Sequence, residues 1–273
     1  MKDDLWEKYW KQYSLMLSNP FNLIRLKQSI IFYKWLESKF DSLISILDAG
    51  SGTGISSIAF AMHRKKVVLL DTSLEALKTS KKFYNFLSLE AEFIQADLFK
   101  MPFKRDIFNI VHNRGVLEHF NSKDCIRILS EMSRVGRIIS IVVPYWRNIG
   151  YQLAKSYCQI FNKTWPFGEN IERDYEVNDL IREFKEADIK VKFIKKFGQS
   201  AGIEAIFGVF LTSSPFSLFL NHIMQNFKKK RFKDKITVTN KYILKYNILI
   251  KLSYLFANLT GSKDSLQILG VKR

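Results

Sequence analysis

The feature that most constrains the fold of this chain is a glycine-rich turn between a short apolar strand and a helix. Residues 46–54 read ILDAGSGTG, with Asp48 two positions before the first glycine, and the helix is expected to begin near Ile55. A strand end, bare backbone amides and a helix N-terminus around one point are suited to bind a small ligand. A dinucleotide fingerprint would need its third glycine where Ile55 stands, so a dinucleotide is disfavoured. The alternative is a strand–helix turn without a cofactor, because such glycine patterns also recur by accident.

Acidic residues also follow the next apolar segments. Residues 65–71 end at Asp71, about twenty residues beyond the turn, where a carboxylate can accept hydrogen bonds from both hydroxyls of a ribose. Residues 92–98 contain Asp97, and residues 108–113 form a further apolar segment that leads into a loop. A single acid of this kind is usually just a solvated strand end. Several in the same order instead favour parallel strands whose carboxyl ends face one ligand.

The order of these segments resembles the class I S-adenosylmethionine-dependent methyltransferases, closely over residues 44–143 and more loosely to residue 197. The stretch DLFKMPF at 97–103, followed by FNIV at 108–111, is similar to the members that modify small molecules, quinones and lipids. Those proteins usually have an acid where Asn109 stands, a departure that we expect to affect the strand start rather than the chemistry. The motif for base amines, an Asn or Asp followed by Pro-Pro and an aromatic, is absent at 113–116, which disfavours base methylation.

The resemblance implies an α/β fold: a doubly wound, mostly parallel seven-stranded sheet of the Rossmann-like methyltransferase type. Strand and helix patterns alternate, which favours a parallel sheet with helices on both faces. Helices are expected at 56–64, 73–87 and 122–133, and further strands at 136–144 and 187–197. A seventh, antiparallel strand is expected at 203–211, with a helix there as the alternative.

The sequence predicts three parts of the chain. Residues 1–40 would form an N-terminal helical lid, and residues 41–212 the methyltransferase domain, with an aromatic cap insertion at about 145–176. Residues 213–273 would form a basic, mainly helical and amphipathic C-terminal extension. The N-terminal part carries Trp6, Tyr9, Trp10 and Tyr13 at helical spacing and breaks at Asn19-Pro20. Such an aromatic stripe either packs on the body of the domain or covers the cofactor.

The resemblance also implies S-adenosylmethionine as the cofactor. The matching positions are Asp48, Gly50, Gly52 and Gly54 for the methionine end, Asp71 and Thr72 for the ribose, and Asp97 and Leu98 for the adenine. Asn113 and Arg114 would line the cofactor channel below the acceptor. The methyl group on a sulfonium is already activated, so the protein would mainly supply alignment.

His119, directly after Glu118, is the candidate general base, because histidine titrates near neutral pH. Alternatively it caps a helix or holds the loop, since many methyl transfers need no base. His112 is expected to be structural. Tyr145 and Trp146 begin an aromatic region that either walls an apolar acceptor pocket or forms the private core of a helical cap.

Charge is the second unusual feature of the chain. The sequence has 43 Lys and Arg against 26 Asp and Glu, a formal net charge of +17. The densest basic run is 228–235, and the apolar segment 242–259 with interspersed lysines follows it. We rank a solvated face first, contact with an anionic membrane surface second and the phosphate backbone of nucleic acid last.

The remaining features are consistent with an ordinary globular enzyme. Cys125 and Cys158 match no ligand spacing, so neither a disulfide framework nor a metal site is expected. The N-terminus lacks an apolar signal core, which favours a cytoplasmic setting with peripheral membrane contact as an addition. The sequence thus predicts a methyltransferase acting on a small, apolar or aromatic acceptor, and carries no signal for an oligomeric state. The alternatives are an RNA methyltransferase and a non-catalytic partner protein that binds S-adenosylmethionine.

Overall fold

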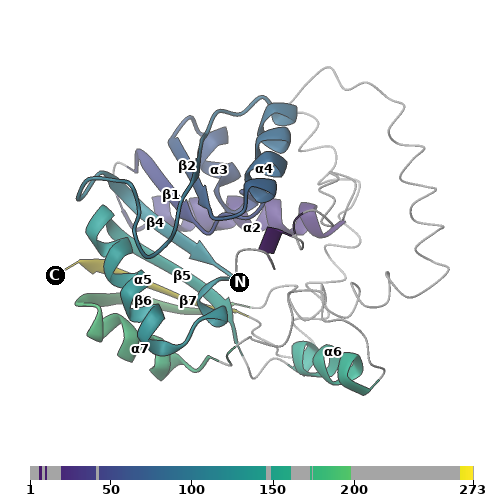
Figure 1. Ribbon diagram of the computed structural model, residues 1–273, viewed down its shortest axis with the longest axis vertical. Coiled ribbons are helices and arrows are strands. Elements are labelled where there is room, and N and C mark those ends of the chain that lie inside the picture. Colours follow the sequence, from purple (N-terminus) through teal and green to yellow (C-terminus); the bar gives the residue numbers. More distant parts are fainter. Residues whose placement is uncertain are drawn as a thin grey trace.

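A seven-stranded sheet forms the centre of the protein (Figure 1). The computed structural model describes residues 6, 7, 10, 20–40, 43–145, 149–160, 173, 175–197 and 265–272. The strands are β1 (Ser45–Ala49), β2 (Lys66–Asp71), β3 (Glu92–Gln95), β4 (Phe108–Arg114), β5 (Gly136–Pro144), β6 (Ile189–Phe197) and β7 (Ser265–Lys272). Their spatial order is β3-β2-β1-β4-β5-β7-β6. All neighbouring pairs are parallel except those of β7, which runs antiparallel to both β5 and β6.

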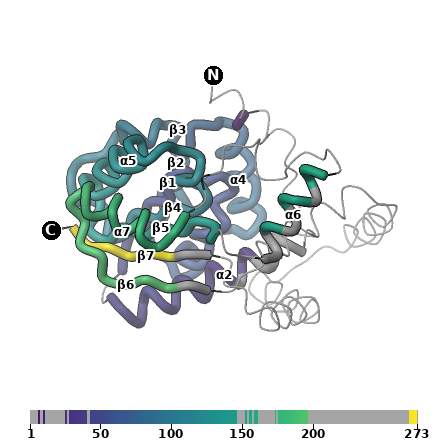
Figure 2. Tube along the Cα trace, turned by 90° about the horizontal axis from the view of Figure 1, so that it is seen from below, coloured from purple at the N-terminus to yellow at the C-terminus, as the bar shows by residue number. Residues whose placement is uncertain are grey.

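Helices cover both faces of this sheet, as expected. The described helices are α2 (Pro20–Glu37), α3 (Ile58–Met62), α4 (Leu74–Leu87), α5 (Ser122–Val135), α6 (Ile149–Ile160) and α7 (Val177–Glu186), with short 3-10 turns η1 (Ile55–Ser57) and η2 (Leu117–His119). Helices α2, α3 and α4 pack on one face through one apolar cluster, and α5 and α7 pack on the other face through a second. Figure 2 shows α2 and α7 on opposite sides of the β6–β7 pair. Helix α2 begins at Pro20, which confirms the predicted break there.

The central strands are apolar on both faces because helices cover both. All five residues of β1 are buried. Ile46 joins the cluster beneath α2 and α3, while Leu47 joins the cluster beneath α5. This near-continuous apolar character is typical of doubly covered parallel strands.

Helix α5 shows how the local sequence fixes one of the covering helices. Asn121 caps its start by accepting a hydrogen bond from the backbone amide of Asp124 at 3.0 Å. Its buried stripe consists of Cys125, Ile128, Leu129, Met132 and Val135, at the spacing of one helix face. Both cysteines of the chain are free and buried, as predicted.

Strand β7 corrects the expected position of the seventh strand. The structure forms it from residues 265–272, which were expected to belong to a separate extension. Residues 203–211, where the strand was expected, lie outside the described residues. Ile268 and Leu269 of β7 are fully buried, on opposite faces of the sheet. The sheet therefore draws two core residues from a segment that local sequence patterns placed outside the domain.

Several other expectations also concern residues that the structure does not describe. They are the basic run 228–235, the apolar segment 242–259, Trp146 and most of the aromatic cap. Within the described ranges, no helix is both long and apolar enough to cross a membrane.

Asn109 illustrates the departure from the usual acid at the start of the fourth strand. Its side-chain oxygen accepts hydrogen bonds from the backbone amides of Ile44 at 3.1 Å and Ser45 at 3.0 Å. The Ser45 hydroxyl donates to the same oxygen at 3.0 Å. Asn109 thus ties the amino ends of β1 and β4 together, at the opposite end of these strands from the glycine turn.

Candidate functional site

The glycine turn lies at the carboxyl ends of β1 and β2. Gly50, Gly52 and Gly54 all have positive φ, at 76°, 52° and 68°, a backbone region that residues with side chains rarely adopt. The backbone amides of Gly50 and Ser51 donate to the carbonyl of Leu70 at 2.8 and 2.9 Å. These bonds anchor the turn against the last residues of β2.

Helix α4 supports the same turn from below. The hydroxyl of Ser80 donates to the Gly52 carbonyl at 2.6 Å, and that of Tyr84 donates to the Gly54 carbonyl at 2.9 Å. The space beside Gly54 is filled, because an added Cβ would lie 2.6 Å from Leu69 and 3.0 Å from Tyr84. Ser80 and Tyr84 are contributions that the sequence reasoning missed, since nothing local links α4 to the turn.

Asp71, at the end of β2, bonds directly to this turn. One carboxylate oxygen accepts from the amide of Gly52 at 2.8 Å, and the other accepts from the amide of Ser73 at 2.9 Å. The side chain is 8% exposed. Burial raises the pKa of Asp71, and the amide hydrogen bonds oppose that effect. The backbone amide of Thr72 also acts on this carboxylate, which leaves about one of its four acceptor positions for a ligand hydroxyl. Thr72 itself is half-buried at the same edge.

Asp48 lies beneath the turn at the end of β1. The hydroxyl of Ser57 donates to its carboxylate at 2.7 Å, and Asp48 is 2% exposed. Burial raises the pKa of Asp48 to about 7, with Ser57 and the Arg114 guanidinium acting in the opposite direction. Asp48 therefore loses its proton less readily than an exposed aspartate, and a nearby cation would favour its ionisation.

The end of β4 completes the same edge of the sheet. Asn113 is fully buried and donates through Nδ2 to the carbonyl of Ala49 at 2.6 Å. Arg114 donates to Gln28 of α2 at 2.5 Å. Asn113 therefore meets the end of β1, whereas Arg114 projects toward α2.

Three buried oxygens around this edge make no hydrogen bond within the described part of the chain. They belong to Ser51 Oγ, Asn113 Oδ1 and Glu118 Oε2. Buried polar atoms normally have hydrogen-bond partners, so these three oxygens are suited to bind a polar ligand. Burial also raises the pKa of Glu118 to about 8, so this side chain is mainly a neutral acid at pH 7 and can donate a hydrogen bond. Together with the Asp48 and Asp71 carboxyl groups, these atoms fit a ligand rich in amino, carboxylate and hydroxyl groups.

Asp97 and Leu98 follow the next strand of the sheet. The amide of Ala96 donates to the Asp71 carbonyl at 3.1 Å, which places the end of β3 beside the end of β2. Asp97 is exposed and accepts from the amide of Phe99 at 2.9 Å. Leu98 is 6% exposed and packs in the core cluster on the α5 face.

Residues of the N-terminal segment lie against this edge. Ring atoms of Trp10 lie 2.7 and 2.8 Å from the position that a Cβ on Gly52 would take. Glu7 accepts a hydrogen bond from the hydroxyl of Ser73 at 2.6 Å. The ring of Trp6 meets that of His119 edge-on, with centroids 4.9 Å apart. Trp6 and Trp10 of the aromatic stripe therefore contact the candidate site, and Glu7 is a further neighbour that the sequence reasoning missed.

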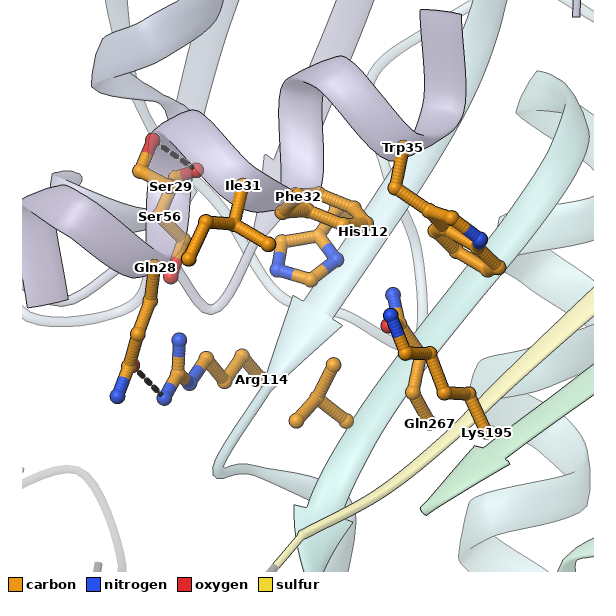
Figure 3. Close-up of a pocket in the computed structure, with 11 residues that line it drawn as sticks. Gln28, Ser29, Ile31, Phe32, Trp35, Ser56, His112, Arg114, Lys195 and Gln267 are labelled. Atoms are coloured by element: carbon orange, nitrogen blue, oxygen red, sulfur yellow. Dashed lines mark hydrogen bonds between the residues drawn. The ribbon is translucent and has the colours of Figure 1, made fainter. Parts of the chain in front are cut away.

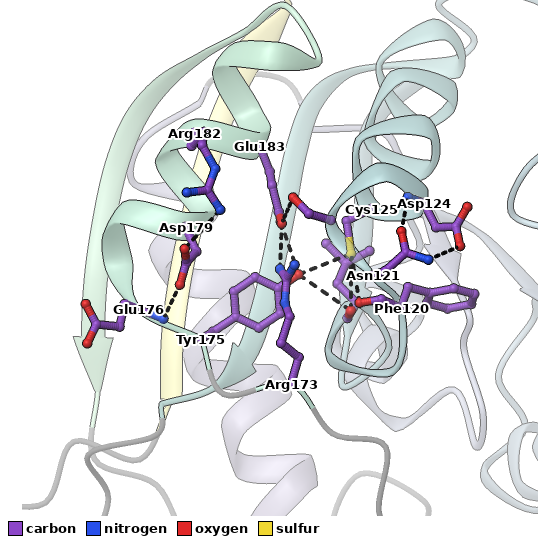
Figure 4. A network of polar contacts seen from close by, with 12 residues as sticks. Phe120, Asn121, Asp124, Cys125, Arg173, Tyr175, Glu176, Asp179, Arg182 and Glu183 are labelled. Carbon is purple, nitrogen blue, oxygen red and sulfur yellow. Dashed lines mark hydrogen bonds and ion pairs between the residues drawn. The ribbon is translucent and has the colours of Figure 1, made fainter.

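The aromatic region after β5 is described only in part. Half-buried Tyr145 forms an isolated parallel bridge with Tyr175. Tyr175 is fully buried and donates to Glu183 of α7 at 3.1 Å, in the network drawn in Figure 4. Glu183 also accepts from Arg173 at 2.5 Å and from Ser122 of α5 at 2.8 Å. These contacts anchor the chain after β5 on the face that α5 and α7 cover.

The fold and the edge just described define a doubly wound α/β protein with a ligand site built on a glycine turn and strand-end acids. A family model described as a methyltransferase domain matches residues 46–137. Demethylmenaquinone methyltransferase of Streptomyces avermitilis is 34% identical over 145 residues, which cover 51% of this chain and 57% of that protein. An uncharacterized protein of Methanocaldococcus jannaschii is 31% identical over 182 residues, covering 64% of this chain and 71% of that protein.

Solved structures share the same fold. Magnesium protoporphyrin IX methyltransferase from Synechocystis, with bound S-adenosylhomocysteine, gives a TM-score of 0.55 at 13% identity over 99% of this chain and 93% of that chain. The YcgJ protein of Bacillus subtilis gives a TM-score of 0.55 at 14% identity over 90% of this chain and 99% of that chain. The chain belongs to the class I S-adenosylmethionine-dependent methyltransferases. S-adenosylmethionine is the cofactor of this family.

Proposed function

We propose that this protein transfers the methyl group of S-adenosylmethionine to a small, apolar or aromatic acceptor. The observation that carries the proposal is the group of orphaned buried oxygens beside the glycine turn, on the edge where Asp48, Asp71 and Asn113 meet. The similarity to a demethylmenaquinone methyltransferase supports an aromatic acceptor. The chain spans only 57% of that protein's length. We therefore infer the chemical class of the acceptor and do not assign demethylmenaquinone itself to this chain.

In this proposal each cluster of residues has one task. Asp48, the glycine turn and the orphaned Asn113 oxygen hold the methionine end, and Asp71 with Thr72 holds the ribose. Asp97 and Leu98 border the adenine. S-adenosylmethionine supplies a methyl group that its sulfonium already activates, so the protein needs to position the acceptor and exclude water.

The residues nearest the acceptor would come from the ends of β4 and β5. Arg114 lines the channel, Tyr145 and Trp146 border the acceptor, and His119 acts as general base where the acceptor must lose a proton. The contacts of Trp6 and Trp10 with His119 and Gly52 support a lid over the cofactor at the start of residues 1–40, ahead of α2, which packs on the sheet. A lid of this kind would keep water from the reacting groups.

Calorimetric titration of S-adenosylmethionine and S-adenosylhomocysteine tests the cofactor part of the proposal directly. Micromolar binding of both is expected, followed by formation of S-adenosylhomocysteine when reduced menadione is supplied as a model aromatic acceptor. Binding without turnover on any aromatic or apolar acceptor would instead favour the non-catalytic partner protein. If the folded protein binds neither ligand, the proposal fails.

The raised pKa of Asp48 predicts that cofactor affinity depends on pH. A cationic amino group favours the carboxylate, so binding must displace the proton that Asp48 carries below pH 7. Affinity for S-adenosylhomocysteine should therefore be roughly tenfold weaker at pH 6 than at pH 7.5, with protons released on binding. Calorimetry in two buffers of different ionisation enthalpy measures both quantities.

Asp48→Asn is the matched control for this prediction, because it keeps the shape and removes the titration. Its affinity should be low and nearly constant over the same pH range. Glu118→Gln should retain the wild-type dependence, since the pKa of Glu118 lies higher, at about 8. An unchanged pH dependence in Asp48→Asn would show that another group titrates.

A further inference from the structure

A pocket lies between α2 and the sheet, on the face opposite α5 and α7 (Figure 3). Its lining residues are Gln28, Ser29, Ile31, Phe32, Trp35, Ser56, His112, Arg114, Val142, Lys195 and Gln267. They come from α2, from the turn before α3 and from strands β4, β5, β6 and β7. None of them belongs to the glycine turn or to the segments around Asp71 and Asp97. Arg114, at the end of β4, is the residue that the pocket shares with the proposed cofactor edge.

The pocket combines apolar walls with polar groups that are built into the core. Phe32, Trp35 and Val142 supply apolar surface, and Gln28 and Gln267 are 3% and 4% exposed. Buried amides that converge on a mostly apolar pocket are typical of small-molecule sites, where they fix orientation.

His112 anchors the polar side of this pocket. It is 1% exposed, packs against the ring of Phe32 at a tilt of 36° with centroids 4.6 Å apart, and its Nδ1 lies 3.1 Å from the hydroxyl of Ser140. Gln267 donates to the same hydroxyl at 3.4 Å. Burial lowers the pKa of His112 to about 3, so the ring is neutral at physiological pH. His112 is therefore held in place, as expected of a structural residue, and it also lines the pocket.

The charges around the pocket all have one sign. The lining contains Arg114 at the end of β4 and Lys195 at the end of β6, and no carboxylate. The Arg114 guanidinium already acts on Asp48 and Glu118, two acids of the cofactor edge. Lys195 is exposed and lies 5.4 Å above the ring of Trp35. Because Arg114 already interacts with these two acids, an anionic group of a ligand would be attracted most to the end of the pocket near Lys195. The apolar part of that ligand would then extend toward Arg114.

We propose that this pocket receives the methyl acceptor, and that the acceptor is a planar apolar molecule carrying an anionic group such as a carboxylate. The anion would lie near Lys195 and Gln267, the body would contact Phe32, Trp35 and Val142, and the reacting end would face Arg114. This inference rests on the proposed methyl transfer and adds the charge of the acceptor and the place of its non-reacting end.

Binding of 2-naphthoate, a planar aromatic carboxylate, tests the pocket by calorimetry on the full-length protein. Lys195→Gln should weaken binding by about three- to tenfold, because it removes the cation and keeps a polar side chain only one atom shorter. Lys190→Gln is the matched control, since Lys190 is an exposed lysine on the same strand that does not line the pocket. The neutral 2-naphthamide should bind more weakly than 2-naphthoate to the wild type and equally to both variants.

The same preparations are titrated with S-adenosylhomocysteine, so that the two proposals can fail separately. If S-adenosylhomocysteine binds and 2-naphthoate does not, or if the two lysine variants bind 2-naphthoate equally, the pocket inference is overturned and the methyltransferase proposal stands. If 2-naphthoate binds in a Lys195-dependent way and S-adenosylhomocysteine does not bind, the proposed function fails and the acceptor role of the pocket fails with it. Unchanged affinity of Lys195→Gln for S-adenosylhomocysteine confirms that the variant is folded.

Discussion

Gly54→Ala should lower the free energy of unfolding by about 2–5 kcal/mol and abolish measurable binding of S-adenosylhomocysteine. Two effects add at this position. The backbone has a φ of 68°, which costs an L residue roughly 1–2 kcal/mol. The new Cβ would also lie 2.6 Å from Leu69 and 3.0 Å from Tyr84, and overpacking of this kind costs roughly 1–3 kcal/mol. Relief of the clash would move the turn, and with it the proposed cofactor site.

Gly115→Ala separates these two effects. Gly115 has nearly the same φ, 71°, but the nearest atom to an added Cβ is a carboxylate oxygen of Glu118 at 3.6 Å. The strain should remain and the overpacking should not, so about 1–2 kcal/mol is expected. Urea unfolding measures both variants. Equal losses at the two glycines would contradict the assignment of Gly54 as a packed position.

Asp71→Ala should weaken S-adenosylhomocysteine binding more than tenfold and lower the free energy of unfolding by about 2–4 kcal/mol. The carboxylate accepts from the amides of Gly52 and Ser73, at 2.8 and 2.9 Å, in a side chain that is 8% exposed. Its removal leaves these two amides without their acceptor, and an unpaired buried amide costs roughly 1–3 kcal/mol. Any ribose contact is lost in addition, which is why affinity and stability should both fall.

Two variants make the Asp71 result specific. Asp71→Asn keeps one acceptor oxygen and should lie between the wild type and Asp71→Ala in both measurements. Asp106→Asn removes an exposed carboxylate that pairs with Lys272 at 3.0 Å, and exposed pairs contribute about 1 kcal/mol or less. Titration calorimetry and urea unfolding report the two quantities. A stable Asp71→Ala protein with normal affinity would show that Asp71 neither supports the turn nor contacts the ligand.

Strand-end residues were predictable from the sequence because parallel strands bring their carboxyl ends to one edge. Asp48, Asp71 and Asn113 are separated along the chain, but each follows an apolar run, and the structure places all three around the glycine turn. The hydrogen bonds of Ser57, Ser80 and Tyr84 could not be predicted from the sequence. They join helical residues to Asp48 and to the glycine turn, and no local pattern indicates such contacts.

Strand β7 could not be located for a related reason. Residues 265–272 pair with β5 in an antiparallel register in which Ser140 faces Leu269, and no local pattern connects such distant segments. An apolar run at 203–211 was therefore the more visible candidate. The N-terminal aromatics raised the same difficulty: their spacing predicts a stripe on a helix but not the surface that the stripe contacts. The contacts of Trp6 with His119 and of Trp10 with Gly52 favour a cover over the candidate site rather than packing elsewhere on the domain.

The position of β7 also has a consequence for the growing chain on the ribosome. Strand β6 pairs only with β7 in the described sheet, and β7 is translated about 70 residues after β6 ends. At roughly 5–20 residues per second, this delay lasts on the order of 4–14 s. During that time β5 has an open edge and both apolar clusters lack the residue that β7 contributes. Open strand edges and incomplete cores are the surfaces through which unfinished chains associate, so this fold is most vulnerable to aggregation while it is being made.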